Sequence, residues 1–116
     1  MHELSIVEAL IDQVGRELGR SNQKGRVLQL ELSIGRLSGV NCESVRFAFG
    51  LLAPGTPAEN AEIVIQQPKA VCLCHACHAR LEIDDLVVQC PQCASSDITI
   101  EGGRELALQS IEVEDS

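Results

Sequence analysis

The sequence has almost no aromatic residues: among its 116 residues only Phe47 and Phe49 are aromatic, and it has no tryptophan or tyrosine. Proteins that bind single-stranded nucleic acid stack bases on aromatic side chains, and this chain has few to offer. Positive charge is also scarce, since 9 Lys and Arg residues stand against 17 Asp and Glu residues and the formal net charge is −8. Such a chain would repel a phosphate backbone. We therefore expect no nucleic acid among its partners.

The sequence also lacks long apolar runs. No window approaches the roughly 18 consecutive apolar residues of a membrane span. The N-terminal segment has neither the basic flank nor the apolar core of a signal peptide. We expect a cytoplasmic protein with no membrane partner. In a reducing compartment, its six cysteines are expected to be metal ligands or free thiols rather than disulfides.

Four of the cysteines form two closely spaced pairs, Cys74-x-x-Cys77 and Cys90-x-x-Cys93. Each such turn directs two thiolates at one centre, and two turns together complete the tetrahedral four-sulfur site that Zn²⁺ favours. A closed site of this kind has no free position for a substrate, so we expect the zinc to be structural. Iron in a rubredoxin-like site and an iron–sulfur cluster also accept four thiolates, and the spacing alone does not separate them from zinc.

The two remaining cysteines and the nearby histidines have plainer interpretations. Cys72 is too close to Cys74 to form the same turn with it, and we expect Cys72 and Cys42 to be small packed residues. The first cysteine pair followed by His78 also matches the c-type haem attachment pattern, but that interpretation leaves the second pair unexplained. We expect His75 and His78 to lie outside the ligand set or at the surface.

The spacing of apolar residues predicts one α/β core. Apolar side chains recur every three or four positions from Leu4 to Leu18, which predicts an amphipathic helix, and they alternate from Leu28 to Ile34, which predicts a half-buried strand. Asn41 can cap a second helix whose buried face runs from Val45 to Leu52. The apolar run from Ile63 to Ile65 predicts a second strand.

A third strand is predicted from Leu106 to Val113. Its apolar residues do not keep one regular alternation along the strand. Leu106 and Leu108 share one parity, whereas Ile111 and Val113 share the other. Either a β-bulge lies near Gln109-Ser110 or both faces of the strand are partly covered, and we favour the bulge.

The cysteine segment, residues 70–101, lies between the second and third predicted strands, so we expect it to be an insertion into the core. Within it, apolar residues on both sides of Asp84-Asp85 predict a hairpin with one cysteine pair on each side: Leu81, Ile83, Val87 and Val88. The expected division is therefore a domain of residues 1–69 plus 102–116 and an inserted domain of residues 70–101.

The first residues offer a second candidate metal site. A free amine at Met1, the adjacent backbone amides and the imidazole of His2 together form an all-nitrogen, square-planar donor set. Such a set suits Ni²⁺ or Cu²⁺ rather than Zn²⁺. The site requires that nothing precedes Met1. A histidine near a chain end is more often an ordinary residue, so His2 alone does not decide between the two interpretations.

Several motifs taken together resemble the HypA/HybF family of hydrogenase nickel-incorporation proteins. They are Met1-His2-Glu3-Leu4-Ser5, Leu32-Ser33-Ile34-Gly35, Phe47-Ala48-Phe49 and the two late cysteine pairs. The resemblance covers essentially the whole chain. It implies an α+β fold of two helices on a three-stranded mixed sheet with an inserted zinc-ribbon-like domain. The nickel-binding domain would be 1–69 plus 102–116, and 70–101 would be a four-cysteine zinc domain.

The resemblance implies a nickel metallochaperone that serves [NiFe]-hydrogenase maturation and, in some members, urease. His2 would bind Ni²⁺ with the Met1 amine, and Glu3 would lie at the same site. Cys74, Cys77, Cys90 and Cys93 would hold Zn²⁺. The implied partners are a nickel-handling GTPase and the hydrogenase large subunit, with the protein itself a monomer or homodimer. We expect no enzymatic activity, because the sequence has no Ser/His/Asp set and no phosphate-binding glycine loop.

The main alternative is a zinc-ribbon module that binds nucleic acid or a transcription complex. Residues 70–101 contain Arg80 as their one Lys or Arg against five acidic residues, which is the wrong charge for that role. One departure from the family pattern also matters: His78 follows Cys77, but Ala94 follows Cys93. Any mechanism in which paired histidines rearrange the zinc site is therefore in doubt for this chain.

Overall fold

The computed structural model describes residues 3–22 and 25–114, which form two compact units. The core unit comprises Met1–Leu32, Val40–Ile65 and Ala107–Ser116. The cysteine unit comprises Ser33–Gly39 and Gln66–Leu106. Within the described ranges, neither helix has the length and apolar character needed to span a membrane.

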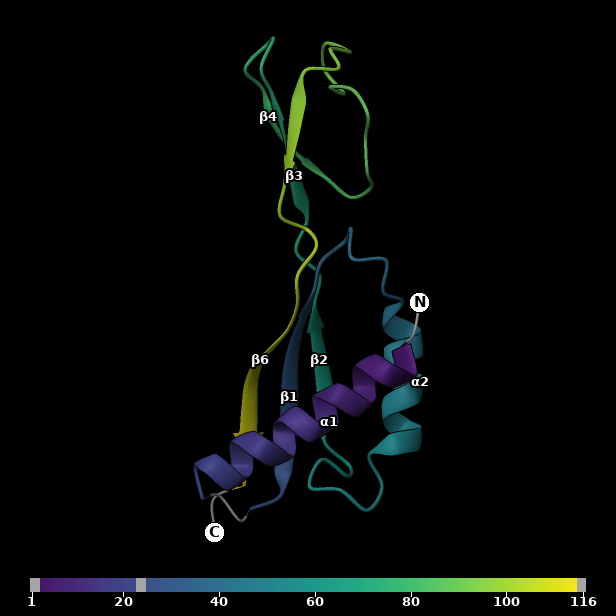
Figure 1. Ribbon diagram of the computed structural model, residues 1–116, viewed down its shortest axis with the longest axis vertical. Coiled ribbons are helices and arrows are strands. Elements are labelled where there is room, and N and C mark those ends of the chain that lie inside the picture. The colour runs from purple at the N-terminus through teal and green to yellow at the C-terminus, as the bar shows by residue number, and fades with distance from the viewer. Residues whose placement is uncertain (1–2, 23–24, 115–116) are drawn as a thin grey trace. The chain divides into compact units, whose positions relative to one another are not determined.

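The core unit contains two helices and a three-stranded sheet of order β2-β1-β6 (Figure 1). The helices are α1 (Glu3–Arg20) and α2 (Cys42–Leu52), and the strands are β1 (Val27–Ile34), β2 (Glu62–Gln66) and β6 (Leu106–Val113). Each of these elements lies where the apolar spacing predicts it, with ends that differ by a few residues. The two helices and three strands of the prediction are confirmed.

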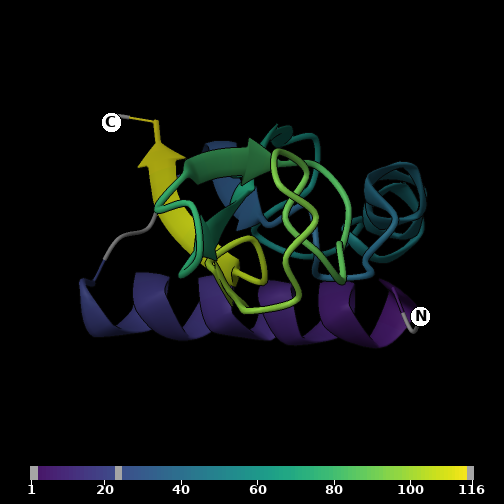
Figure 2. The ribbon, with the colours of Figure 1, turned by 90° about the horizontal axis from the view of Figure 1, so that it is seen from above.

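Most apolar residues of the predicted stripes become the core of this unit, but Leu4 (51% exposed) and Leu28 (39% exposed) do not. Its buried side chains come from both helices and from the central strand, and burial of each large one contributes about 1.5–3 kcal/mol. They include Val7, Leu10, Val14, Leu18, Val27, Leu30, Leu32, Val45, Ala48 and Phe49. In the view from above, the N-terminal end of α1 lies nearest α2, and the two helices pack together (Figure 2). The buried stripe of α1 therefore fixes this helix against the rest of the unit.

The sheet is mixed, as the family resemblance implied. Gly35 N–H donates to the Glu105 carbonyl and Glu114 N–H donates to the Arg26 carbonyl, so β6 runs antiparallel to β1. β1 and β2 are joined by a crossover through α2, which is the connection that parallel strands require.

A side-chain hydrogen bond joins β6 to β1 beside the predicted bulge. The Ser110 hydroxyl donates to Glu31 Oε1 at 3.3 Å. A regular ladder starting from Gly35 and Glu105 would pair Ser110 with Leu30, on the opposite face from Glu31. The bonds at the two ends of this strand pair, Gly35 with Glu105 and Arg26 with Glu114, are nine residues apart on both strands, so they leave no net extra residue in β6. The bulge near Gln109-Ser110 therefore stays a prediction.

The cysteine unit is built on an antiparallel sheet of order β4-β3-β5. Its strands are β3 (Ala70–Cys74), β4 (Arg80–Ile83) and β5 (Ile98–Glu101). The predicted hairpin between 81–83 and 87–88 is wrong, because β4 pairs with β3. Val87 is instead packed against the small core of this unit, formed by Ala70, Cys72 and Ile83 with Leu37, Ile98 and Ile100.

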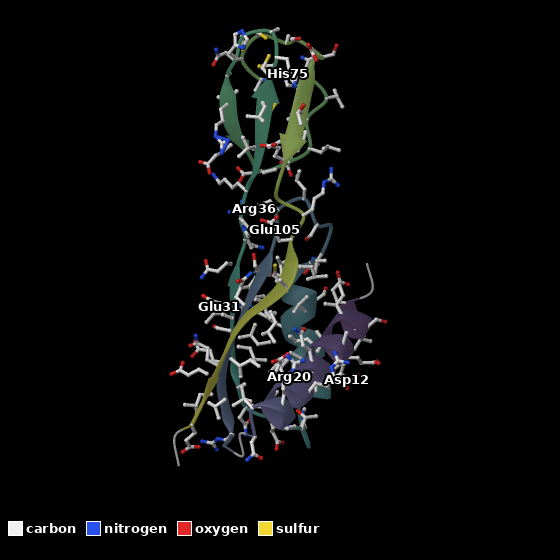
Figure 3. The ribbon with its side chains drawn as sticks, turned by 60° about the vertical axis from the view of Figure 1, so that its left-hand side comes forward. Asp12, Arg20, Glu31, Arg36, His75 and Glu105 are labelled. Carbon is white, nitrogen blue, oxygen red and sulfur yellow. The ribbon has the colours of Figure 1, made fainter. Side chains whose placement is uncertain are left out.

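The cysteine unit also includes a segment that lies far away in the sequence. Leu37 N–H donates to the Gly103 carbonyl at 2.6 Å, and the Arg36 guanidinium contacts Asp84 at 2.9 Å. Arg36 and Glu105 lie near each other in Figure 3, where the segment after β1 meets the segment before β6. The structural unit therefore extends beyond residues 70–101 on both sides and includes Ser33–Gly39.

Candidate metal centre

The sulfur atoms of Cys74, Cys77, Cys90 and Cys93 converge on one point. All four lie within 4.8 Å of one another, with Cys74 Sγ 3.6 Å from Cys93 Sγ and Cys77 Sγ 3.8 Å from Cys90 Sγ. A tetrahedron with Zn–S bonds of about 2.3 Å has sulfur–sulfur edges of about 3.8 Å. The four cysteines therefore fit a tetrahedral four-sulfur metal site, and they form the one such group of ligands among the described residues.

Backbone N–H groups of the first cysteine pair stabilise a thiolate at Cys74. The N–H groups of Cys77 and Ala76 donate to Cys74 Sγ at 3.3 and 3.4 Å. The Cys77 N–H is the largest influence on Cys74, and with the other donors it outweighs burial and lowers the pKa of Cys74 to about 6. The turn therefore stabilises the charged form that a metal binds.

The second cysteine pair repeats this arrangement. The N–H groups of Cys93 and Gln92 both donate to Cys90 Sγ at 3.4 Å. The Cys93 N–H is the main cause that lowers the pKa of Cys90, with the Gln92 N–H acting in the same direction. Both turns thus present one backbone-stabilised sulfur to the same centre.

The remaining two thiols resist ionisation on their own. The Ala79 N–H lowers the pKa of Cys77, but burial and the side chains of Cys74, Cys93 and Cys90 raise it overall to about 12. Four thiolates in contact repel one another, so they cannot all ionise unless a cation neutralises them. A divalent metal ion supplies that charge, and the chemistry of the donor set therefore fits a bound metal.

The backbone after each cysteine pair has the same conformation. His78 has φ 63° and Ala94 has φ 66°, both in the left-handed region that non-glycine residues rarely adopt. The two turns are thus equivalent in backbone although one carries histidine and the other alanine. The histidine is not needed to form the turn.

The other candidate residues of this region lie outside the sulfur cluster. His75 is exposed, and its Nε2 is 2.7 Å from Thr99 Oγ1 on β5 (Figure 3). Cys72 is 1% exposed in the core of the cysteine unit. Cys42 is the first residue of α2. Sequence reasoning missed the His75–Thr99 contact, since it depends on the pairing of β3 with β5 and no local pattern signals it.

Of the three candidate residues at the N-terminus, Met1 and His2 lie outside the described residues. Glu3 is the first residue of α1, and its Oε2 accepts a hydrogen bond from Asn41 N–H at 3.0 Å. Sequence reasoning identified Asn41 as a helix cap but missed this contact, because residues 3 and 41 meet only through the packing of α1 on α2.

A family model described as "Hydrogenase/urease nickel incorporation, metallochaperone, hypA" matches residues 1–113. The chain belongs to the HypA family. As a HypA-family member it is a metallochaperone of hydrogenase and urease maturation rather than an enzyme. The resemblance noted from the sequence motifs is confirmed.

Relatives and solved structures agree with this assignment to the HypA family. "Hydrogenase maturation factor HypA" of Chlorobium limicola is 41% identical over 115 residues, covering 99% of this chain and 98% of the relative. The protein of the same description from Methanocaldococcus jannaschii is 32% identical over 121 residues, with 98% of each chain covered. The solution structure of the Ni metallochaperone HypA from Helicobacter pylori matches with a TM-score of 0.66 and 25% identity over 97% of each chain.

Proposed function

We propose that this protein binds Ni²⁺ at its N-terminus and delivers it for maturation of [NiFe]-hydrogenase, and of urease where that enzyme is present. The match of the nickel-incorporation family model over residues 1–113, which include Met1-His2-Glu3, is the observation that carries the proposal. His2 binds the metal through its imidazole, the Met1 amine and adjacent backbone nitrogens complete the site, and Glu3 lies beside it.

The contact of Glu3 supports a positioning role at this site. Its carboxylate is held by the Asn41 N–H, and it lies at the N-terminal end of α1, where a negative charge is favourable. This bond fixes the first helical turn, from which the two preceding residues continue in sequence. Glu3 therefore limits where the nickel-binding nitrogens can be placed.

An all-nitrogen site at a chain end suits delivery as well as binding. Its square-planar preference favours Ni²⁺ over the more abundant Zn²⁺. Its amine and imidazole can each be taken from the metal by protonation or replaced by the ligands of an acceptor. The same site therefore holds the ion selectively and gives it up without any covalent change in the protein.

The four-cysteine centre holds a structural Zn²⁺ in this proposal. The four sulfur atoms lie within 4.8 Å of one another, which fits the four-coordinate site that structural Zn²⁺ favours. We retain the assignment of nickel binding to residues 1–69 plus 102–116 and of zinc binding to residues 70–101. The zinc would hold the ends of β3, β4 and β5 together, since the unit has only a small apolar core.

The proposed partners are the proteins that nickel delivery to hydrogenase would require. We propose a nickel-handling GTPase and the hydrogenase large subunit, both met in the cytoplasm by a monomer or homodimer of this chain. Nucleic acid and membranes are not partners in this proposal, because the chain carries a formal charge of −8.

Complementation in a bacterium that lacks its own HypA-family protein tests delivery. The native gene should restore nickel in the purified hydrogenase large subunit, whereas His2→Ala should not. His78→Ala serves as the matched control, because it removes a histidine outside the proposed nickel site. High external nickel should restore the His2→Ala strain in part. If His2→Ala restores hydrogenase nickel as well as the native gene does, the proposed site is wrong.

A further inference from the structure

The outer edge of β6 has no partner strand among residues 3–22 and 25–114. In the sheet order β2-β1-β6 it is the last strand, and β1 is its one neighbour among the described strands of that sheet. It is eight residues long, roughly 26 Å at about 3.3 Å per residue. Edge strands are commonly protected by charged side chains, especially lysine, by proline or by β-bulges; β6 contains no lysine or proline, and Glu112 is its one exposed charged residue. Figure 1 shows β6 at one edge of this sheet, where the outer backbone groups of the strand have no described partner strand.

A groove runs beside this edge, within the core unit. Its volume is about 560 Å³, and it lies between the C-terminal half of α1 and β6. It is lined by Gln13, Glu17, Leu18, Ser21, Leu108, Gln109, Ser110, Ile111 and Val113. The groove can receive the side chains on one face of an added strand, while the edge can pair with its backbone.

The charge of the groove indicates what kind of strand it suits. Glu17 is the one charged side chain among the described lining residues, and it is 40% exposed although Arg20 lies 3.5 Å away. Glu112 is exposed on β6 itself, and Glu114 follows it, with its carboxylate 3.7 Å from the Arg26 guanidinium. Together with the net charge of −8, these carboxylates favour a segment that carries Lys or Arg among apolar residues.

One pairing of this edge with a second copy of the chain brings like charges together. In the antiparallel register that opposes Leu108 to Ile111, Glu105 of each copy would face Glu114 of the other. Like charges directly opposite in a ladder are destabilising.

We infer that the β6 edge and its groove bind an extended, basic segment of a partner protein by adding it to the sheet as a fourth strand. The backbone of the segment bonds to the free edge of β6. Its apolar side chains on the helix side contact Leu18 and Ile111, and a cationic side chain pairs with Glu17. This site does not require the nickel site, because its residues lie on the later half of α1 and on β6.

A short acetylated and amidated peptide of alternating lysine and valine tests the inference on zinc-loaded protein. In ¹⁵N NMR it should shift the amides of β6 and of α1 beside the groove, and slow hydrogen exchange of β6 amides that do not face β1. An analogue N-methylated on one backbone edge keeps its charge but loses those donors. It should bind roughly tenfold or more weakly, because several hydrogen bonds are lost.

A pair of variants separates the groove from general charge attraction. Glu17→Lys and Glu8→Lys change the net charge equally on the same helix, but Glu8 does not line the groove. Glu17→Lys should weaken peptide binding several-fold more than Glu8→Lys. The inference would be overturned if both variants weakened peptide binding equally, or if the N-methylated analogue bound as well as the peptide. Amide shifts away from β6 and α1, or no peptide binding at all, would overturn it as well. Concentration-dependent protection of β6 without peptide would do so too, since it assigns the edge to a second copy.

Discussion

The Glu3 carboxylate accepts a hydrogen bond from the backbone N–H of Asn41 at 3.0 Å. The side chain of Asn41 in turn accepts from Ser44 N–H at 2.9 Å and caps α2. Asn41 thus joins the first turn of α1 to the first turn of α2. Glu3 is also the residue that follows the proposed nickel-binding residues directly in sequence.

Removal of the Glu3 carboxylate should loosen this junction. Glu3→Ala should lower the free energy of unfolding by about 1 kcal/mol, since one hydrogen bond and one favourable helix-terminus charge are lost. Glu3→Gln keeps an acceptor oxygen and should recover part of that loss. Urea unfolding of the zinc-loaded proteins measures both values. If the alanine variant is as stable as the native protein, the contact does not hold the helix start in solution.

The same two variants separate positioning by Glu3 from direct nickel coordination. A positioning role predicts that Glu3→Gln keeps most of the nickel affinity, whereas Glu3→Ala lowers it. Direct coordination by the carboxylate predicts that both variants lose affinity, because a neutral amide is a weaker ligand. Nickel titration followed by absorption spectroscopy distinguishes the two outcomes.

The two neighbouring cysteines of β3 should behave differently when changed to serine. Cys74→Ser removes a metal ligand, so bound zinc should fall well below one ion per chain. Cys72→Ser places a hydroxyl in the core beside Ala70 and Ile83, where we expect a loss of about 1–3 kcal/mol in stability with zinc still at one per chain. Metal analysis of purified protein, with urea unfolding, checks both. Loss of zinc in the Cys72 variant would make that thiol a ligand.

Two glycines should respond in opposite directions to alanine. A Cβ on Gly35 would meet the backbone of Gly103 and Arg104, so Gly35→Ala should cost about 1–3 kcal/mol or more through overpacking. Gly15 lies within α1 with nothing within 4 Å of the added carbon, so Gly15→Ala should stabilise by about 0.5–1 kcal/mol. Thermal unfolding of both variants gives the comparison. A stabilised Gly35 variant would contradict the close crossing of the two segments.

Glycine in place of Ala94 should remove the steric cost of the left-handed backbone in the second cysteine turn. Ala94 has φ 66°, and glycine avoids the cost of roughly 1 kcal/mol that a side chain incurs there. Ala94→Gly should therefore leave stability unchanged or raise it by up to about 1 kcal/mol, after the greater entropy of the unfolded glycine chain is counted. Ala76→Gly, in the first turn and without a positive φ, should lower it. Resistance of bound zinc to a chelator provides a second measure.

The core unit could be predicted because its helices and its central strand carry apolar residues at regular spacing. Leu30 and Leu32 alternate with polar residues, and the stripe from Val7 to Leu18 has helical spacing, so local pattern and burial agree. The cysteine ligands could be predicted for a similar reason. Their spacing is dictated by the turn that points two sulfurs at one ion.

The cysteine unit was harder to predict because long-range contacts determine its strands. Val87 and Val88 resemble a strand by composition, yet Val87 packs into the core of the unit while Val88 is 81% exposed, and β4 pairs instead with β3. The inclusion of Ser33–Gly39 in this unit depends on Gly35 passing close to Gly103. No periodicity in the sequence records such a crossing.

The central claim is that nickel binds at the native N-terminus. The most direct test is Ni²⁺ titration of zinc-loaded protein whose first residue is Met1, beside a version with one extra residue before Met1 and a His2→Ala version. The account predicts one nickel per chain with a square-planar absorption spectrum in the native protein, and loss of that site in both variants with zinc retained. Equal nickel binding by all three proteins would contradict it.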